Sequence, residues 1–176
     1  MEWYPIKEKT CCFTGHRPSK LPWGFDEEHP DCIALKNRIA GEVERLYDRG
    51  CRHFITGMAR GADLYFAEAV LALRERRPDV TLEAAIPCTS QADSWHLAER
   101  MRYGAILDRC DMETLIQREY TRDCMLRRNR YMVDHSGFLL AVYNGEGRGG
   151  TQYTLNCAME QGLEIVVIPV DAAKEK

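Results

Sequence analysis

The residues of this sequence best suited to hold a negatively charged ligand follow short apolar segments. The first group begins at the last residue of the apolar run 10–14 and comprises Thr14, Gly15, His16 and Arg17. Gly15 lets the backbone turn sharply and approach a ligand closely. The Arg17 guanidinium can pair bidentately with a phosphate, and His16 can donate or accept a hydrogen bond near neutral pH. The alternative is a tight turn that carries a surface arginine.

A second group follows the apolar run 53–56 and comprises Gly57, Met58, Ala59, Gly61, Ala62 and Asp63. Small residues before a helix start leave backbone N–H groups free, and the helix dipole adds partial positive charge there. The segment therefore predicts a phosphate cradle, although it matches neither the G-x-G-x-x-G nor the Walker A pattern. In the alternative interpretation, Asp63 only complements the helix dipole.

A third group follows the apolar run 137–142, where four glycines lie between Asn144 and Thr151. We expect Thr151 to cap a helix, with Asn144, Gly149, Gly150 and Thr151 forming a second anion-binding turn. The alternative is a flexible loop without a ligand. If the groups converge, Arg17→Ala and Gly61→Glu should each weaken binding without unfolding the protein.

The elements that must position these turns alternate along the chain. Strands are predicted over 10–14, 53–56, 80–86, 112–116, 137–142 and 163–168, with 112–116 the weakest. Helices are predicted over 33–49, 62–77, 122–134 and 151–162, and from a capping box at Ser90 and Asp93 toward Leu107. This alternation predicts an α/β fold with a parallel sheet covered on both faces, and ligands bind such sheets at the carboxyl ends of the strands.

Composition narrows the function classes. The chain has 176 residues, 45% of them hydrophobic, which suits one domain over 1–176 with a core from about 10 to 170. Its net charge of -3 argues against a duplex-DNA binder, which normally carries a basic surplus. The connection 17–30 is long and rich in proline, glycine and acidic residues, so we expect it to be functional or mobile.

The eight cysteines contain no C-x-x-C pair, so we expect no metal site. We interpret them as reduced thiols, and we see neither a signal peptide nor an apolar run long enough to span a bilayer. A cytoplasmic protein without a membrane or nucleic-acid partner is expected.

Five segments together resemble the YpsA-type branch of the SLOG superfamily: CFTGHRP (12–18), TGMARGAD (56–63), IPCTSQADSW (86–95), RRNRYMVDHS (127–136) and GGTQYT (149–154). The superfamily also includes DprA-like DNA-processing proteins and LOG-type cytokinin-activating enzymes. The similarity runs from about Thr10 to Ile168.

This resemblance implies a three-layer Rossmann-like fold with a six-stranded, mostly parallel sheet in the order 3-2-1-4-5-6. The switch point would lie between the first and fourth strands, with residues 15–17 at the centre of the pocket. Gly57 and Gly61 would lie on one side, and residues 149–151 on the other.

The resemblance also adds Gln91, Trp95, Arg128 and Asn129 to the pocket. Trp95 would offer a surface on which a base stacks, and Arg128 would contact phosphate. The alternatives are core packing for Trp95 and a solvated helix face for Arg128.

Three functions follow from the resemblance. The favoured one is a small-molecule binding or sensing domain for a nucleotide or nucleotide-derived ligand, with no required cofactor, no assigned catalytic residue and a homodimer left open. A LOG-type phosphoribohydrolase is disfavoured because Thr154 stands where that signature has its glutamate, and a hydroxyl cannot replace a carboxylate. A DprA-type single-stranded DNA binder is the third. Apart from the resemblance, the residues offer a Cys88–His96 nucleophile pair as a further alternative.

Overall fold

The computed structural model describes residues 4–174, and their helices and strands alternate as predicted. In chain order the elements are η1 (Lys7–Lys9), β1 (Thr10–Thr14), η2 (Pro18–Lys20), α1 (Pro30–Asp48), β2 (His53–Thr56), α2 (Ala62–Arg76), β3 (Thr81–Ile86), α3 (Leu97–Arg109), β4 (Met112–Leu115), α4 (Cys124–Asp134), β5 (Phe138–Tyr143), α5 (Gly150–Glu160) and β6 (Glu164–Pro169). None of these helices has an apolar stretch sufficient to cross a lipid bilayer.

The six strands form one parallel sheet, which confirms the Rossmann-like fold class. The strand order is β4-β3-β2-β1-β5-β6, so the predicted order 3-2-1-4-5-6 is wrong. β1 pairs with β2 on one side and with β5 on the other, and the switch point lies between β1 and β5.

The burial of the strands explains this order. A strand in the middle of a three-layer sheet must be apolar on both faces. β5 (FLLAVY) meets this requirement with four consecutive buried residues. β4 (METL) alternates between half-buried and exposed positions, which suits an edge strand, and it pairs only with β3 among the described strands.

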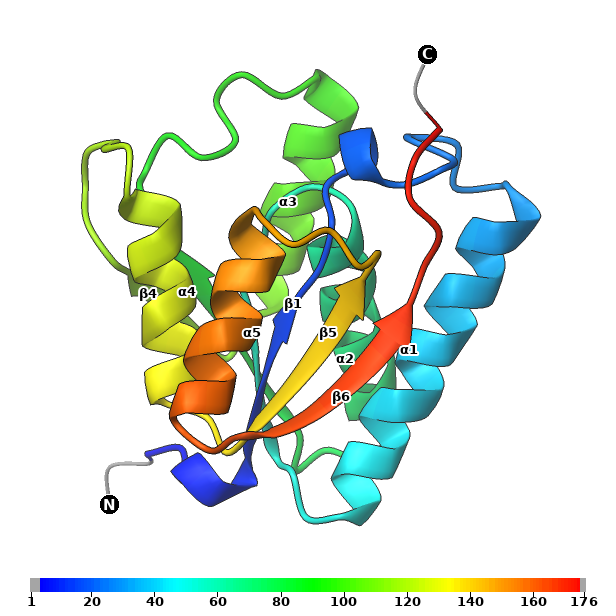
Figure 1. The fold of residues 1–176 in the computed structure, drawn as a ribbon. Coiled ribbons are helices and arrows are strands. Elements are labelled where there is room, and N and C mark those ends of the chain that lie inside the picture. Colours follow the sequence, from blue (N-terminus) through cyan, green and yellow to red (C-terminus); the bar gives the residue numbers. More distant parts are fainter. Residues whose placement is uncertain (1–3, 175–176) are drawn as a thin grey trace.

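The helices cover the sheet in two layers (Figure 1). Cys11 and Phe13 of β1 face the core formed with α1, α2 and α3. Cys12, between them, faces the smaller core formed with α4 and α5. This alternation along one strand is the period of two that a doubly covered sheet requires.

Two predicted helix caps differ from the structure. α3 begins at Leu97, because residues 90–95 form successive turns in which the Asp93 N–H donates to the Ser90 carbonyl (3.1 Å). The predicted capping box at Ser90 is therefore wrong. α5 begins at Gly150 with Gly149 as its N-cap, so Thr151 lies inside the first turn and does not cap the helix.

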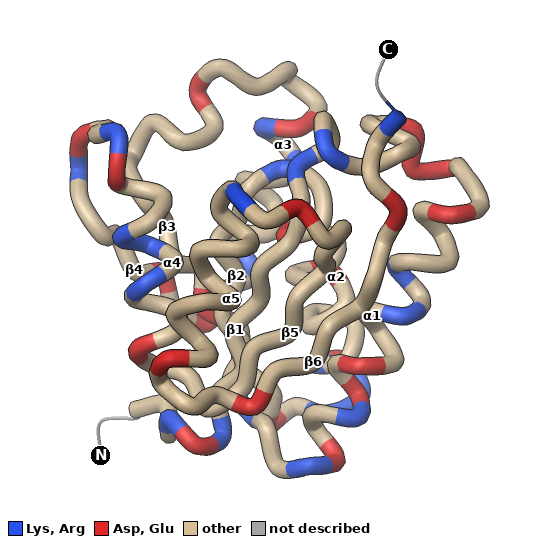
Figure 2. The backbone as a smooth tube through the Cα atoms, viewed as in Figure 1, with Lys and Arg blue, Asp and Glu red and all other residues tan. Residues whose placement is uncertain are grey.

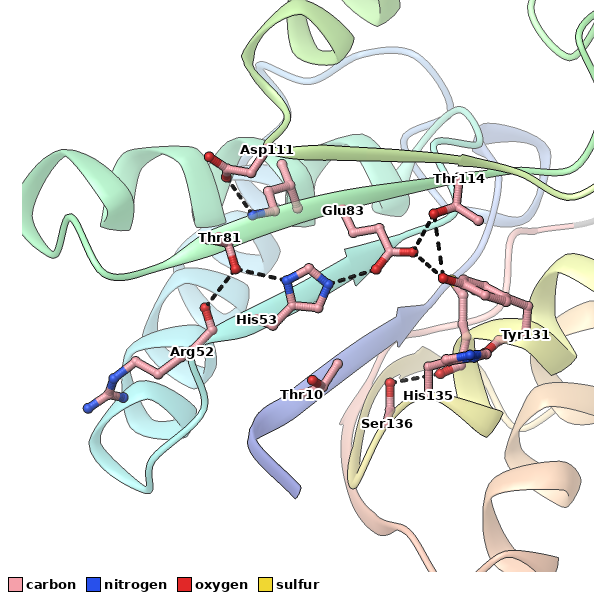
Figure 3. Close-up of polar contacts among 12 residues, drawn as sticks. Thr10, Arg52, His53, Thr81, Glu83, Asp111, Thr114, Tyr131, His135 and Ser136 are labelled. Atoms are coloured by element: carbon pink, nitrogen blue, oxygen red, sulfur yellow. Dashed lines mark hydrogen bonds and ion pairs between the residues drawn. The ribbon is translucent and has the colours of Figure 1, made fainter. Parts of the chain in front are cut away.

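A buried polar network, which the sequence analysis did not predict, joins three strands to α4 (Figure 3). His53 of β2 bonds through Nε2 to Oε1 of Glu83 of β3 (2.7 Å). The other carboxylate oxygen accepts hydrogen bonds from the Tyr131 hydroxyl (2.6 Å) and the Thr114 hydroxyl (2.9 Å). Since Glu83 is almost fully buried, these donors are what make its charge tolerable beneath α4.

We expect Glu83→Gln to destabilise the fold by about 1–3 kcal/mol at pH 7, since it disturbs a charged acceptor with three donors. Burial by itself raises the pKa of Glu83, but the hydrogen bonds from His53 and Tyr131 outweigh it and hold the pKa below its ordinary value of 4.5. The carboxylate therefore stabilises the fold above about pH 4.5, and this contribution is lost as the pH falls further. Urea unfolding should show the gap between wild type and variant shrinking below that pH.

The matched control is Glu113→Gln, which changes an exposed glutamate on the adjacent strand β4. A control that loses as much stability as Glu83→Gln, or a gap that widens in acid, would contradict this account of the network.

Candidate functional site

A cavity of about 690 Å³ opens at the carboxyl end of β1, between α4 and the start of α5. It brings together residues from all three predicted turns and from α4. The predicted site residues that line it are Thr14, Gly15, His16, Arg17, Ala59, Asp63, Arg128, Asn129, Gly149, Gly150 and Thr151. The convergence of these segments on one concavity is the arrangement that the sequence predicted.

The other predicted site residues are not part of the cavity lining. They are Gly57, Met58, Gly61, Ala62, Gln91, Trp95 and Asn144. Gln91 donates a hydrogen bond to the Gly57 carbonyl (3.3 Å), and the backbone N–H of Asn144 donates to Nε2 of His16 (3.0 Å). Asn144 thus contacts the lining residue His16, and the Gly57 carbonyl that accepts from Gln91 also accepts from the lining residue Arg128.

Trp95 does not offer a free ring face to the cavity. Its side chain is buried, 8% exposed, and its ring packs edge-on against Tyr103 with centroids 5.3 Å apart. The guanidinium of Arg60 lies over the Trp95 ring, 5.4 Å from its centroid. These contacts correspond to the core-packing alternative.

Two glycines, Gly15 after β1 and Gly61 before α2, allow the turns that carry them to approach each other closely. A Cβ on Gly15 would lie 2.7 Å from the Cβ of Ala62. Gly61 has a φ of +85°, and a Cβ there would lie 2.7 Å from the His16 carbonyl oxygen, which accepts the Ala62 N–H. We therefore revise the expectation for Gly61→Glu, because a side chain at this position would distort the turn itself.

The turn between β2 and α2 (residues 57–63) uses several of its backbone N–H groups for hydrogen bonds within the protein. The Met58 N–H donates to the Thr56 hydroxyl (3.2 Å), and the Ala59 N–H donates to Oδ2 of Asp63 (3.1 Å). The Ala62 N–H donates to the His16 carbonyl (3.1 Å). These three amides are therefore not available to a phosphate, and Asp63 acts here as an acceptor that closes its own turn.

The start of α5 is different. Gly149 is the N-cap with a φ of +101°, and no side chain in the described part of the chain caps the helix. Gly149, Gly150 and Thr151 all line the cavity. An uncapped helix start presents N–H donors and the positive end of the helix dipole, so this turn is the better candidate for an anion.

The side chains around the cavity carry a positive surplus. Its lining includes five basic residues, Arg17, Lys20, Arg122, Arg128 and Arg148, and two acidic residues, Asp63 and Glu146. Glu146 is paired with Lys20 at 2.5 Å, whereas the Arg17 guanidinium has no hydrogen bond or ion pair with any residue in 4–174 that the structure records. Burial lowers the pKa of His16, which keeps this residue neutral.

Arg128 and Asp63 lie at the base of the cavity, both nearly inaccessible to solvent. The Arg128 guanidinium donates to Oδ1 of Asn129 (2.8 Å) and to the Gly57 carbonyl. Burial lowers the pKa of Arg128, and the nearby Asp63 charge opposes that effect. Burial raises the pKa of Asp63 to about 6, against the opposing effects of Arg128, the Ala59 N–H and Arg17.

Sequence reasoning missed the basic residues Lys20, Arg122 and Arg148 and the apolar wall formed by Met125, Leu126 and Tyr153. Arg148 lies within the glycine-rich segment 144–151, and this position next to a predicted anion-binding turn could have identified it. Lys20 lies in the connection 17–30, whose course the sequence does not reveal, and Arg122 lies just before α4, at the start of the helix predicted over 122–134.

The structure does not assemble the catalytic alternatives. Thr154 is fully buried and its hydroxyl donates to the Gly150 carbonyl (2.9 Å), so it does not reach the cavity. Cys88 is buried with its sulfur 3.6 Å from the Ser90 hydroxyl, while His96 is exposed at the start of α3. Among the described residues, no group of three or more His, Cys, Asp and Glu side chains is arranged to hold a metal ion.

Comparison with known proteins gives one family and several relatives. The model of the YspA SLOG family matches residues 11–170. A UPF0398 protein of Halalkalibacterium halodurans is 27% identical over 155 residues, which are 87% of this chain and 82% of that protein. UPF0398 proteins of Bacillus thuringiensis and Bacillus cereus are 26% identical over 156 residues, covering 88% of this chain and 84% of each relative. The predicted resemblance is confirmed over nearly the whole chain.

We expect Gly61→Ala to destabilise the protein by more than about 1 kcal/mol, because alanine is strained at positive φ and its Cβ would collide with the His16 carbonyl. The control is Gly104→Ala in α3, where a Cβ meets open space and φ is not positive. Alanine should stabilise that helix by about 0.5–1 kcal/mol. Thermal unfolding of both variants measures the difference, and equal midpoints would contradict the close approach of the two turns.

We expect Asp63→Asn to change the pH dependence of stability. Between the ordinary pKa of 3.8 and the raised value of about 6, the folded protein holds a proton that the unfolded chain releases. The free energy of unfolding of the wild type therefore falls as the pH rises through this window. The variant has no carboxyl group at position 63, so its stability does not fall for this reason. The unfolding free energy of the variant relative to wild type should rise by up to about 3 kcal/mol between pH 4 and pH 7.

Chemical denaturation at several pH values measures this difference, with Asp108→Asn, an exposed site on α3, as the control. A constant difference between Asp63→Asn and wild type across the window would show that burial does not raise the pKa of Asp63.

Proposed function

Because the chain belongs to the YspA SLOG family, we propose that its cavity binds a nucleotide or a nucleotide-derived ligand through the ligand's phosphate groups. In this proposal the protein is a small-molecule binding or sensing domain. The phosphate lies between the start of α5 and the Arg17 guanidinium, and Arg148, which directly precedes the N-cap Gly149, lines the same cavity.

One observation carries the proposal: the cavity has five basic and two acidic side chains, although the whole chain has a net charge of -3. Figure 2 shows basic and acidic residues mixed along the helices α1, α2 and α3. The basic surplus is therefore a feature of the residues that line the cavity. Placing unpaired positive charge in a concavity costs self-repulsion, and an anionic ligand relieves it.

The local character of this charge also separates the proposal from single-stranded DNA binding. A nonspecific single-strand binder needs a basic groove with aromatic residues along several nucleotides. A LOG-type hydrolase would need a carboxylate at the position of Thr154, whose hydroxyl is buried and occupied by the Gly150 carbonyl. The described residues therefore favour binding without turnover.

The test is calorimetric titration of the purified protein with inorganic pyrophosphate and with nucleoside diphosphates. Wild type should bind them, and Arg17→Ala should weaken binding by roughly 10- to 100-fold, the value of a lost charge-assisted hydrogen bond. Arg148→Ala should act in the same direction. The matched control is Arg100→Ala, an exposed arginine of α3 that does not line the cavity.

Mass spectrometry of the titrated mixtures should recover the nucleoside diphosphates intact. The proposal fails if wild type binds none of these anions, or if Arg17→Ala and Arg100→Ala bind them equally well. Conversion of a nucleotide to its base would favour the hydrolase.

A further inference from the structure

A second cavity, of about 1140 Å³, adjoins the first. Arg17 and Ser19 line both cavities, so the two are contiguous around the end of the first turn. The walls of the second cavity come from the long connection after β1 and from residues 171–174 after β6. Figure 1 shows these two segments, blue and red, close together above the sheet.

This second cavity contains an exposed aromatic ring. Phe25 is 59% exposed, whereas the neighbouring Trp23 is buried and stacks on His29 with centroids 6.4 Å apart. An exposed phenylalanine at a cavity wall leaves apolar surface in water, which a ligand that covers it would remove.

Arg60 fixes the position of this ring. Its guanidinium lies 5.7 Å from the centroid of Phe25 and 5.4 Å from the centroid of the buried Trp95. An ion pair with Glu99 (3.4 Å) further restrains the guanidinium. The aromatic partner of Arg60 that remains accessible to a ligand is thus Phe25, and Trp95 serves as the buried support.

We propose that this second cavity holds the ring-bearing part of the ligand, a nucleobase stacked on Phe25 beside Arg60. The proposal rests on the proposed function, since the phosphate on Arg17 is what directs the rest of the ligand across the shared wall. The ligand class is then a nucleoside phosphate whose base lies under the connection 17–30, on the side of the cavity away from α4.

The test compares the binding of pyrophosphate with the binding of ADP, GDP, CDP and UDP. Each of these nucleotides adds a nucleoside to the same diphosphate group. In wild type, at least one nucleoside diphosphate should bind more tightly than pyrophosphate. Phe25→Ala should weaken the binding of that nucleotide by roughly 5- to 100-fold, the range for loss of one base–aromatic stack. The affinity for pyrophosphate should stay unchanged. Phe25→Trp should restore the nucleotide affinity.

Two further variants separate the outcomes. Tyr120→Ala removes another exposed aromatic, which lines neither cavity, and should have no effect. Leu126→Ala trims the wall on α4. If Leu126→Ala weakens the nucleotide and Phe25→Ala does not, the base lies against α4 and the inference is overturned.

The subsite and the proposed function fail differently. Binding of pyrophosphate by wild type together with nucleotide affinities that Phe25→Ala leaves unchanged overturns the subsite alone. Absence of binding for every probe overturns the proposed function and the subsite with it. Because Phe25 is largely exposed, its truncation should leave the thermal midpoint close to that of wild type, which verifies that the variant is folded.

Discussion

The arrangement of the site depends on one buried cation, the guanidinium of Arg128. It enters the space behind the β2–α2 turn only because residue 57 is glycine: a Cβ there would lie 2.6 Å from Cζ of Arg128. A charge taken out of water must be compensated by acceptors or by an opposite charge. The Gly57 carbonyl, the Asn129 side chain and the charge of Asp63 supply this compensation. One side chain thereby fixes the position of α4 relative to the β2–α2 turn.

The same cation determines the character of the cavity above it. Asp63 is close enough to Arg128 for their charges to interact, and it uses one oxygen on the Ala59 amide. The carboxylate of Asp63 at the base of the cavity thus interacts with groups of the protein itself. The Arg17 guanidinium at the rim has no hydrogen-bond or ion-pair partner among the described residues, and this difference contributes to the positive surplus of the cavity.

Much of the fold could be predicted because its signals are local. Apolar strands alternate with amphipathic helices, and Gly15, Gly57 and Gly149 mark where strands turn toward helices. The strand order could not be predicted in the same way, because it depends on which strand tolerates burial on both faces. The alternating exposure of β4 excludes it from the centre, and this became evident only with the neighbours of each strand.

The same distinction between local signals and contacts between distant segments applies to the candidate site. That Arg17, Asp63 and Gly150 line one cavity follows from the geometry of parallel sheets. That the Ala59 and Ala62 amides are already used, or that Arg60 covers Trp95, depends on contacts between segments that no spacing reveals. Residue type identified which groups could bind an anion, and only packing decided which of them remain available.

The strand order also has a consequence for synthesis on the ribosome. β1, β2, β3 and β4 are adjacent in the sheet in the order in which they are translated. Once these four strands have paired, the free edge of β1 still lacks β5, whose first paired residue, Phe138, lies far along the chain from its partner Cys11. During elongation the nascent chain therefore presents the unpaired edge of β1, whose five residues are all buried in the folded protein, and such edges promote association with other chains. That edge is covered only when β5 has emerged and paired with β1, after which β6 completes the sheet.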